Sequence, residues 1–332
     1  MSTLFAKDNT ERTPVFVLTG FLGSGKTTLL NRLLREPSLA DTAVIVNELG
    51  EVALDHLLVE RIEGEVALLR SGCICCAVRG DFEETLRELL ARRDEGSLPS
   101  FARVVVETTG LADPAPLLQA VDTNPLLAHF CRVGAVLATV DVVNAQSQLE
   151  RQWEARKQVA LADWLLLTKT DLVPVSPDLE QRLGEINPAA RRQVLAPDAL
   201  PAELLQPRPT HRAVREAAGL LAGRRIAPVG GHHGDVQSFV LQADTPLDWP
   251  RLQDWLANLR AEHGERLLRL KAVVSVQGEP APLVLHGVQH LFHPPLAAPL
   301  IDWPAGRSAL VFIGRGLDEA AVRSGFQACL AS

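Results

Sequence analysis

Residues 20–28, with the sequence GFLGSGKTT, have the residue types and spacing of a phosphate-binding loop. The three glycines let the backbone curl so that successive N–H groups point at one anion. Lys26 is expected to reach the β- and γ-phosphates of a nucleotide, and the Thr27 hydroxyl is expected to bind Mg²⁺. A glycine turn before an amphipathic helix is the alternative, but the Lys-Thr pair favours nucleotide binding. The predicted nucleotide-binding residues of this loop are Gly20, Gly23, Ser24, Gly25, Lys26, Thr27 and Thr28.

The segments around this loop are those that a phosphate-binding loop requires. An apolar run at residues 14–19 predicts a buried strand, and leucines recur at helical spacing in residues 29–35. A helix is expected from a cap at Asp81 to about Arg93. Strands that alternate with helices and end in polar residues imply an α/β P-loop domain with a mostly parallel sheet covered on both faces. The further strands predicted for this sheet are residues 43–46, 66–69, 102–106, 132–140 and 162–167.

Glu107, at the end of the strand in VVVETTG, is the predicted acidic partner of Thr27 at the Mg²⁺ site. Asp113 is the second choice. The alternative role for Glu107 is to cap the turn, because strand-end carboxylates also accept hydrogen bonds from backbone N–H groups. Gly110 suggests a backbone amide that faces the γ-phosphate, so that the loop responds to the third phosphate.

Residues 168–171, TKTD, resemble the Asn-Lys-x-Asp signature with which GTPases recognise guanine. The Asp171 carboxylate would accept hydrogen bonds from guanine N1–H and N2–H₂, which adenine does not offer, and Lys169 would lay its stem over the base. A bidentate base contact of this kind discriminates by roughly 1–3 kcal/mol. Thr168 replaces the asparagine, which puts in question any bond from that side chain. An ordinary strand end is the alternative.

Three of the five cysteines lie together, at Cys73, Cys75 and Cys76. Clustered thiols in a reducing compartment point to a metal ion. Tetrahedral Zn²⁺ requires its sulfurs closer together than side chains on a straight strand, so the segment must bend, and Gly72 permits this. Three thiolates leave one position open, which favours a transferable ion. Small buried hydrophobic residues or a redox pair are the alternatives.

Other polar residues are weaker candidates. In NELGE, Glu48 is a candidate for orienting the hydrolytic water and Glu51 for a place near the metal, although a solvated loop fits nearly as well. His232 and His233 stand between glycines and could load metal, but a polar linker is favoured. His290 and His293 alternate with apolar residues, and structural roles are favoured for them.

The chain of 332 residues, with a net charge of −7, predicts two domains and no nucleic-acid or membrane partner. The first residues lack a secretory apolar region, which predicts a cytoplasmic protein. The second domain is expected to be a smaller α+β domain with a largely antiparallel sheet in the order β-α-β-β-β-α. The expected division is a disordered lead-in at 1–13, a P-loop GTPase domain at 14–225, a linker at 226–235 and a C-terminal domain at 236–332.

The motifs GFLGSGKTT, NELG, GCICC, ETTGLADP and TKTD, followed by GERLLRLKAVV, GVQHLFHPP and LVFIG, closely resemble the CobW-type metallochaperone GTPases. The likeness covers nearly the whole chain. It implies a P-loop G domain related to the nickel-inserting GTPases, followed by the CobW-type C-terminal domain. It also implies that GTP, Mg²⁺ and Zn²⁺ or Co²⁺ are the cofactors, and that the cysteine-bound ion passes to a client metalloprotein when GTP is hydrolysed.

The resulting hypothesis is a GTP-hydrolysing metal insertase in which Lys26, Glu107 and Glu48 serve catalysis. A nucleotide-modulated metal sensor or zinc buffer is the first alternative. A P-loop small-molecule kinase is the second, and TKTD argues against it. A homodimer is left open, and the identity of the client does not follow from the sequence.

Overall fold

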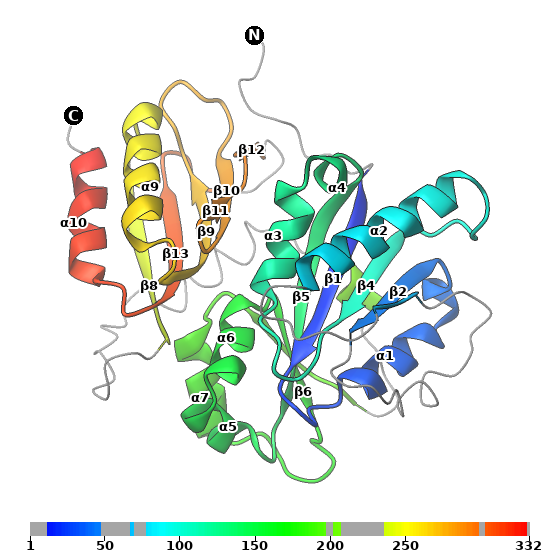
Figure 1. Ribbon diagram of the computed structural model, residues 1–332. Coiled ribbons are helices and arrows are strands. Elements are labelled where there is room, and N and C mark those ends of the chain that lie inside the picture. Colours follow the sequence, from blue (N-terminus) through cyan, green and yellow to red (C-terminus); the bar gives the residue numbers. More distant parts are fainter. Residues whose placement is uncertain are drawn as a thin grey trace. The chain divides into compact units, whose positions relative to one another are not determined.

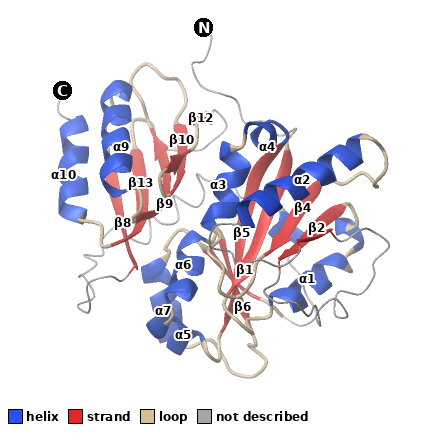
Figure 2. Cartoon of the chain, viewed as in Figure 1, coloured by secondary structure: helices blue, strands red, loops and turns tan. Residues whose placement is uncertain are grey.

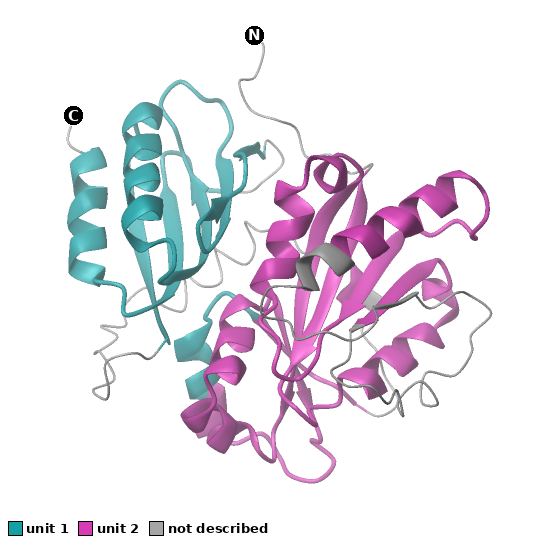
Figure 3. Ribbon diagram, in the orientation of Figure 1, with its two compact units in different colours: residues 1–9, 181–190, 208–332 teal, residues 10–180, 191–207 magenta. Residues whose placement is uncertain are grey.

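The computed structural model describes residues 12–47, 67–69, 78–196, 202–206, 236–298 and 303–330 (Figure 1). Its helices and strands (Figure 2) belong to two compact units (Figure 3). Unit 2 comprises residues 10–180 and 191–207, and unit 1 comprises residues 1–9, 181–190 and 208–332. The two units therefore interleave in the sequence.

Unit 2 contains a seven-stranded sheet in which every neighbouring pair of strands is parallel. The spatial order β3-β2-β4-β1-β5-β6-β7 places β1 at the centre. Residues 15–20 of β1 are all buried, as expected for a central strand that is covered on both faces. The strands are β1 (Thr13–Gly20), β2 (Thr42–Asn47), β3 (Ala67–Leu69), β4 (Arg103–Glu107), β5 (Cys131–Asp141), β6 (Trp164–Thr168) and β7 (Arg191–Val194).

Helices cover this sheet on both faces. On one face, the leucines of α1 pack against alternate residues of β1, including Phe16 and Leu18. On the other face, α2, α3 and α4 lie across the sheet (Figure 1). The helices of unit 2 are α1 (Lys26–Leu34), α2 (Val78–Asp94), α3 (Ala115–Thr123), α4 (Pro125–Phe130), α5 (Ala145–Arg151) and α6 (Trp153–Leu161), with short 3-10 turns at Pro37–Leu39 and Ala202–Leu205. Helix α7 (Pro177–Ile186) begins in unit 2, and its residues from Gln181 on belong to unit 1.

The α/β fold class predicted from the sequence is confirmed, with two differences in detail. Helix α2 begins at Val78, so the predicted cap at Asp81 is wrong, and Asp81 lies inside the first turns of the helix. Strand β7 was not predicted, because its sequence Arg-Arg-Gln-Val lacks an apolar run. It lies at the edge of the sheet, where the Arg191 guanidinium stacks 4.6 Å from the centre of the Trp164 ring.

Unit 1 is an α+β unit with an antiparallel sheet, as predicted. Its strands are ordered β11-β10-β9-β13-β8, and β12 pairs with β10. Two helices, α9 and α10, lie side by side on the sheet (Figure 2) and bury an apolar core that includes Leu256, Phe312 and Phe326. The elements are β8 (Val236–Ala243), α9 (Trp249–His263), β9 (Leu267–Val274), β10 (Leu283–Val288), β11 (Leu291–Phe292), β12 (Leu296–Ala297), β13 (Ser308–Arg315) and α10 (Glu319–Leu330).

Local sequence explains where α9 begins. The side chain of Asp248 accepts a hydrogen bond of 2.9 Å from the backbone N–H of Arg251, and a proline follows in the first turn. Both features favour a helix start at this position. Among the helices within the described ranges, none is both long and apolar enough to cross a membrane.

Candidate nucleotide site

The phosphate-binding loop connects β1 to α1, as its sequence predicted. Gly20, Gly23 and Gly25 all have positive φ angles, of 141°, 70° and 92°. At Gly20 there is also no room for a side chain, because an added Cβ would lie 2.3 Å from Thr139 Oγ1. Gly25 is the N-cap residue of α1 and has no side chain that could accept hydrogen bonds from the first N–H groups of the helix. These N–H groups are therefore not capped by a side chain of the loop. This geometry suits an anion.

Lys26 lies in the first turn of α1 and is buried. Its Nζ donates hydrogen bonds to the loop carbonyls of Gly20 at 3.0 Å and Phe21 at 3.3 Å. Burial lowers the pKa of Lys26, and the nearby Glu107 carboxylate opposes this shift. The ammonium group is therefore held against the first two residues of the loop.

Thr27 and Glu107, the two predicted Mg²⁺ ligands, are in direct contact. Thr27 Oγ1 donates a hydrogen bond of 2.7 Å to Glu107 Oε1, although the residues are 80 positions apart in the sequence. The contact forms because β4 pairs with β1, which sets Glu107 beside Leu18 at the carboxyl edge of the sheet. A hydroxyl and a carboxylate are oxygen ligands of the kind that Mg²⁺ prefers, so these residues fit the ion.

Asp113, the second choice for the Mg²⁺ site, makes other interactions. One carboxylate oxygen accepts a hydrogen bond of 3.0 Å from the backbone N–H of Ala115 at the start of α3. The other pairs with Lys157 Nζ at 2.5 Å. The geometry favours Glu107 over Asp113 as the metal ligand.

The loop after Glu107 lies against the phosphate loop. Thr108 donates its backbone N–H to the Leu18 carbonyl at 2.9 Å and its hydroxyl to Thr19 Oγ1 at 2.9 Å. A Cβ at Gly110 would approach the backbone of Leu22 to 2.7 Å. The two loops therefore meet at Gly110, and only glycine fits there.

Thr168, which replaces the expected asparagine, is bonded to the phosphate loop. Its Oγ1 donates to the Ser24 carbonyl at 2.8 Å and lies 3.2 Å from the Val140 carbonyl. The side chain of Ser24 is linked to β5, because Ser24 Oγ and Thr139 Oγ1 are 2.6 Å apart. The threonine thus supplies the link to the loop that its replacement of asparagine had put in question.

Lys169 adopts a left-handed backbone conformation, with φ of 59°, which is uncommon for a residue with a side chain. Its Nζ donates to Asp141 Oδ2 at 2.7 Å. Asp141 is 1% exposed and also accepts hydrogen bonds from Asn144 and from the backbone N–H of Val143. Burial alone raises the pKa of Asp141, but the hydrogen bonds from Lys169, Asn144 and Val143 outweigh it and lower the pKa.

Asp171 is exposed, two residues beyond Lys169, at the same edge of the sheet. Sequence reasoning placed Asp141 at the end of a strand but gave it no function. The only local signal was its position, because its contact with Lys169 joins residues 28 positions apart. The arrangement can hold the Lys169 stem in one orientation beside a base.

The remaining predicted site residues lie outside the described residues: Glu48, Glu51, Cys73, Cys75, Cys76, His232 and His233. Within the described ranges, there is no group of three or more His, Cys, Asp and Glu side chains that could hold a metal ion. Two free cysteines, Cys131 and Cys329, are buried there. Burial raises the pKa of both thiols, that of Cys131 to about 11, so neither is poised to become a metal-binding thiolate.

The two histidines in the C-terminal motif have different surroundings. His290 is exposed, whereas His293 is half-buried with its ring centre 5.9 Å from that of His286. The backbone N–H of His293 also donates to the His286 carbonyl at 2.9 Å.

Comparisons with known protein families give two matches. Residues 14–193 match the family described as the CobW/HypB/UreG nucleotide-binding domain, and residues 236–330 match the cobalamin synthesis protein CobW C-terminal domain. Similar proteins include the zinc chaperone YjiA of Escherichia coli, at 35% identity over 94% of this chain and 97% of that protein. The zinc chaperone CobW of Pseudomonas aeruginosa is 30% identical over 96% of this chain and 92% of its own length.

Solved structures agree with these matches. The structure of Zn(II)-bound YjiA GTPase from E. coli has a TM-score of 0.70 at 30% identity, and the match covers 96% of this chain and 99% of that one.

A relative that matches about half of the chain is the zinc-regulated GTPase metalloprotein activator 1 of Schizosaccharomyces pombe, which is 33% identical over 48% of this chain and 39% of its own length.

Proposed function

The chain belongs to the CobW/HypB/UreG family of GTPases, and on this premise we propose that it uses GTP hydrolysis to deliver zinc to a client metalloprotein. The observation that carries the nucleotide part is the 2.7 Å hydrogen bond between Thr27 and Glu107, directly below the phosphate-binding loop. It brings together a hydroxyl from the first turn of α1 and a carboxylate from the end of β4, beside the loop where the phosphates of a nucleotide would bind.

In this proposal, Thr27 and Glu107 hold Mg²⁺, which supplies charge neutralisation for the phosphates when it is bound. Lys26 turns from the loop carbonyls to the β- and γ-phosphates. The α1 N-terminus and the loop N–H groups bind the remaining phosphate oxygens. Asp171 accepts hydrogen bonds from guanine, and Asp141 holds Lys169 beside the base.

The cargo is proposed to bind at Cys73, Cys75 and Cys76. Thiolates prefer Zn²⁺ and Co²⁺ over Mg²⁺, and the relatives that cover almost the whole chain are named as zinc chaperones. This favours zinc, and Co²⁺ is the alternative ion for the same ligands. The name metalloprotein activator, borne by a relative that matches about half of the chain, supports a client protein as the recipient.

Coupling between the two sites is proposed to pass through the loops at the carboxyl edge of the sheet. The cysteine segment lies between β3 and α2, and β3 pairs with β2, the strand that leads into Glu48. Strand β2 in turn pairs with β4, which ends in Glu107. A γ-phosphate that orders the loops after β2 and β4 would therefore also restrict the end of the cysteine segment that follows β3.

The test is zinc and nucleotide binding by Cys75→Ala, with Cys329→Ser as the control at a cysteine in α10. Cys75→Ala is expected to lower zinc affinity far more than GTP affinity, whereas Cys329→Ser should change neither. Equal losses of the two affinities in Cys75→Ala, or no loss of zinc affinity, would count against the proposal. GTP turnover that is the same with and without zinc or client would instead favour a zinc sensor or buffer.

A further inference from the structure

Helix α6 contains a glutamine at a position where an apolar residue would ordinarily lie. Gln158 is 1% exposed and is surrounded in the helix by buried residues, among them Ala155, Val159 and Leu161. The helix packs on β1 and β5, in the middle of the sheet of unit 2. A buried amide is costly unless its groups are hydrogen-bonded, so this residue requires a reason.

The Gln158 side chain is bonded to the loop that follows β4. Its Nε2 donates to the Gly110 carbonyl and to the Ala112 carbonyl, each at 3.1 Å. Because carbonyl oxygens accept only, these two bonds fix which end of the amide faces the loop. The Oε1 atom is buried and has no hydrogen-bond partner among the described residues. Packing alone would favour leucine here, so the glutamine is best explained by the loop that it holds.

The neighbouring residue of α6 holds the same loop at a second point. Lys157 Nζ pairs with Asp113 at 2.5 Å, and both side chains are partly shielded from solvent. Asp113 also caps the start of α3 through the backbone N–H of Ala115. Consecutive residues of α6 therefore fix the loop at Gly110, Ala112 and Asp113.

The other side of this loop faces the phosphate loop. Gly110 is pressed against Leu22 so closely that a Cβ would lie 2.6 to 2.7 Å from Leu22 atoms. At its beginning the loop is tied to Thr27 through Glu107. Residues 107–113 thus lie between the nucleotide site and α6, and α6 holds the carbonyl groups of Gly110 and Ala112.

We propose that Gln158, with Lys157, is a positioning residue for GTP hydrolysis that holds the Gly110–Asp113 segment in the geometry that reads the third phosphate. It touches neither the nucleotide nor the metal and acts through the loop. The proposal rests on the proposed function, in which this loop faces the γ-phosphate. The hydrogen bonds of Gln158 and the ion pair of Lys157 to this loop together form a clamp. Without the clamp, the loop is no longer preorganised to bind the third phosphate of GTP. GDP lacks that phosphate, so binding of GDP does not require the clamp.

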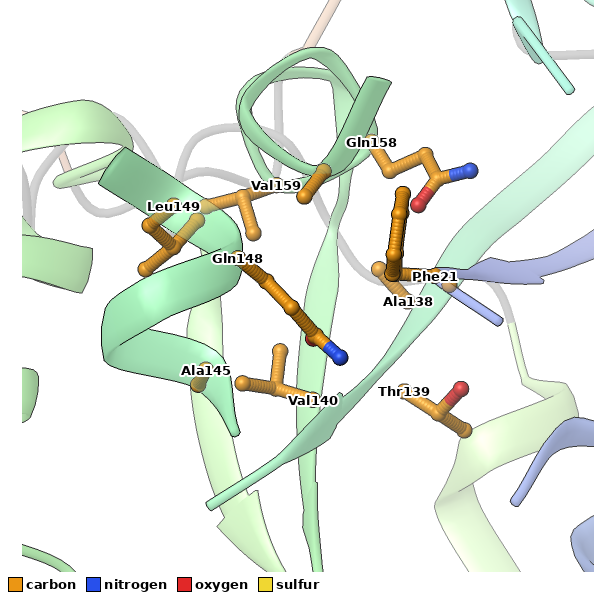
Figure 4. A pocket seen from close by; sticks show the side chains of 11 residues that line it. Phe21, Ala138, Thr139, Val140, Ala145, Gln148, Leu149, Gln158 and Val159 are labelled. Carbon is orange, nitrogen blue, oxygen red and sulfur yellow. The ribbon is translucent and has the colours of Figure 1, made fainter. Parts of the chain in front are cut away.

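The same region offers a matched control. The Gln158 amide borders a small pocket between α5, α6 and β5, with Phe21, Thr139 and Gln148 around it (Figure 4). Its cavity volume of about 20 Å³ gives room for a single water. Gln148, on α5, points into this pocket but makes no hydrogen bond to the loop among the described contacts. Gln148→Leu therefore repeats the chemical change beside the same pocket without breaking the clamp.

The experiment compares wild type, Gln158→Leu and Gln148→Leu for kcat and KM with GTP and for the Kd of GDP and of a non-hydrolysable GTP analogue. Gln158→Leu is expected to lower kcat by about tenfold or more, since two hydrogen bonds to the loop are lost. Gln158→Leu should also raise the Kd of the GTP analogue and leave the Kd of GDP within about twofold of the wild-type value. Gln148→Leu should behave as wild type in all of these measurements. Unchanged kcat in Gln158→Leu, or parallel losses of GDP and analogue affinity, would overturn the proposal.

A second pair of variants covers the case in which Gln158→Leu does not fold. Lys157→Gln breaks the partly exposed half of the clamp, and the same selective loss of kcat is expected, with recovery in Lys157→Arg. No loss in Lys157→Gln would then overturn the proposal. If the wild-type protein binds guanine nucleotides but does not hydrolyse GTP, only the proposed function is contradicted. The clamp proposal then still predicts that Gln158→Leu loses affinity for the GTP analogue and keeps its affinity for GDP.

Discussion

Thr168 connects residues 168–171, the proposed base-recognition segment, to the phosphate loop through a single hydroxyl group. Thr168→Val keeps the shape of the side chain and removes the 2.8 Å bond to the Ser24 carbonyl. Because a hydrogen bond of this kind contributes about 1 kcal/mol, GTP and GDP affinity should fall together by about fivefold. Titration with a fluorescent guanine nucleotide measures this. Thr170→Val, at a half-buried residue of the same segment, is the control, and equal affinities in the two variants would refute the role of Thr168.

Asp171 is the residue on which guanine selectivity is proposed to depend. Asp171→Asn replaces an acceptor with a group that can donate, so the preference should shift from GTP towards xanthosine triphosphate. The shift should be on the order of 10- to 100-fold, given about 1–3 kcal/mol for a bidentate base contact. Competition between the two nucleotides measures it. Asp178→Asn, at an exposed residue of α7, should retain the GTP preference, and retention in Asp171→Asn as well would exclude Asp171 from the base site.

At the scale of elements, the loop between β4 and α3 depends on a close approach of two backbones. Gly110→Ala would place a methyl group within 2.7 Å of the Leu22 backbone, so one of the two loops must move. Displacement of a loop that is proposed to bind or face the nucleotide should reduce GTP turnover by at least about tenfold. Steady-state kinetics measure the loss, and a thermal melt establishes that the variant is folded. Wild-type GTP turnover in folded Gly110→Ala would show that hydrolysis does not depend on the close approach of Gly110 to Leu22.

The elements that could be predicted are those whose own residues form an apolar run or a recognisable motif. Residues 15–20 and 104–107 are continuous buried runs, and a loop with Gly-Lys-Thr follows the first, so β1, β4 and the nucleotide site could be expected. Strand β7 could not, since two of its four residues are arginines and its place depends on Trp164 of a neighbouring strand.

Contacts between distant residues explain why part of the site was missed. Gln158 and Gly110 are 48 positions apart, and a glutamine in a helix ordinarily indicates a surface position. Its function depends on the sheet that brings α6 against the loop after β4. The same holds for Asp141, whose partner Lys169 directly follows β6, the next strand of the sheet.

At the scale of the whole molecule, the structure predicts a stability that depends on pH through Asp122. Burial raises the pKa of Asp122 to about 7, against the opposing charge of Arg12. An unfolded carboxyl ionises near pH ~4, so the folded chain holds an extra proton between about pH 4 and 7. The contribution of Asp122 to the free energy of unfolding therefore falls as the pH rises through this window and is constant above it.

Asp122→Asn removes this titration. The Tm of the variant relative to wild type should be higher at pH 8 than at pH 4.5, as measured by thermal melts across the range. Glu88→Gln, at an exposed position of α2, is the control and should show no such dependence. A Tm difference between Asp122→Asn and wild type that is the same at both pH values would contradict the argument.

The proposed delivery of zinc depends on communication between the third phosphate of GTP and the cysteine segment. The most direct measurement is the Zn²⁺ affinity of the full chain, titrated once with a non-hydrolysable GTP analogue bound and once with GDP bound. We expect tighter zinc binding in the analogue-bound state and release of zinc in the GDP state. The same zinc affinity with both nucleotides would contradict it.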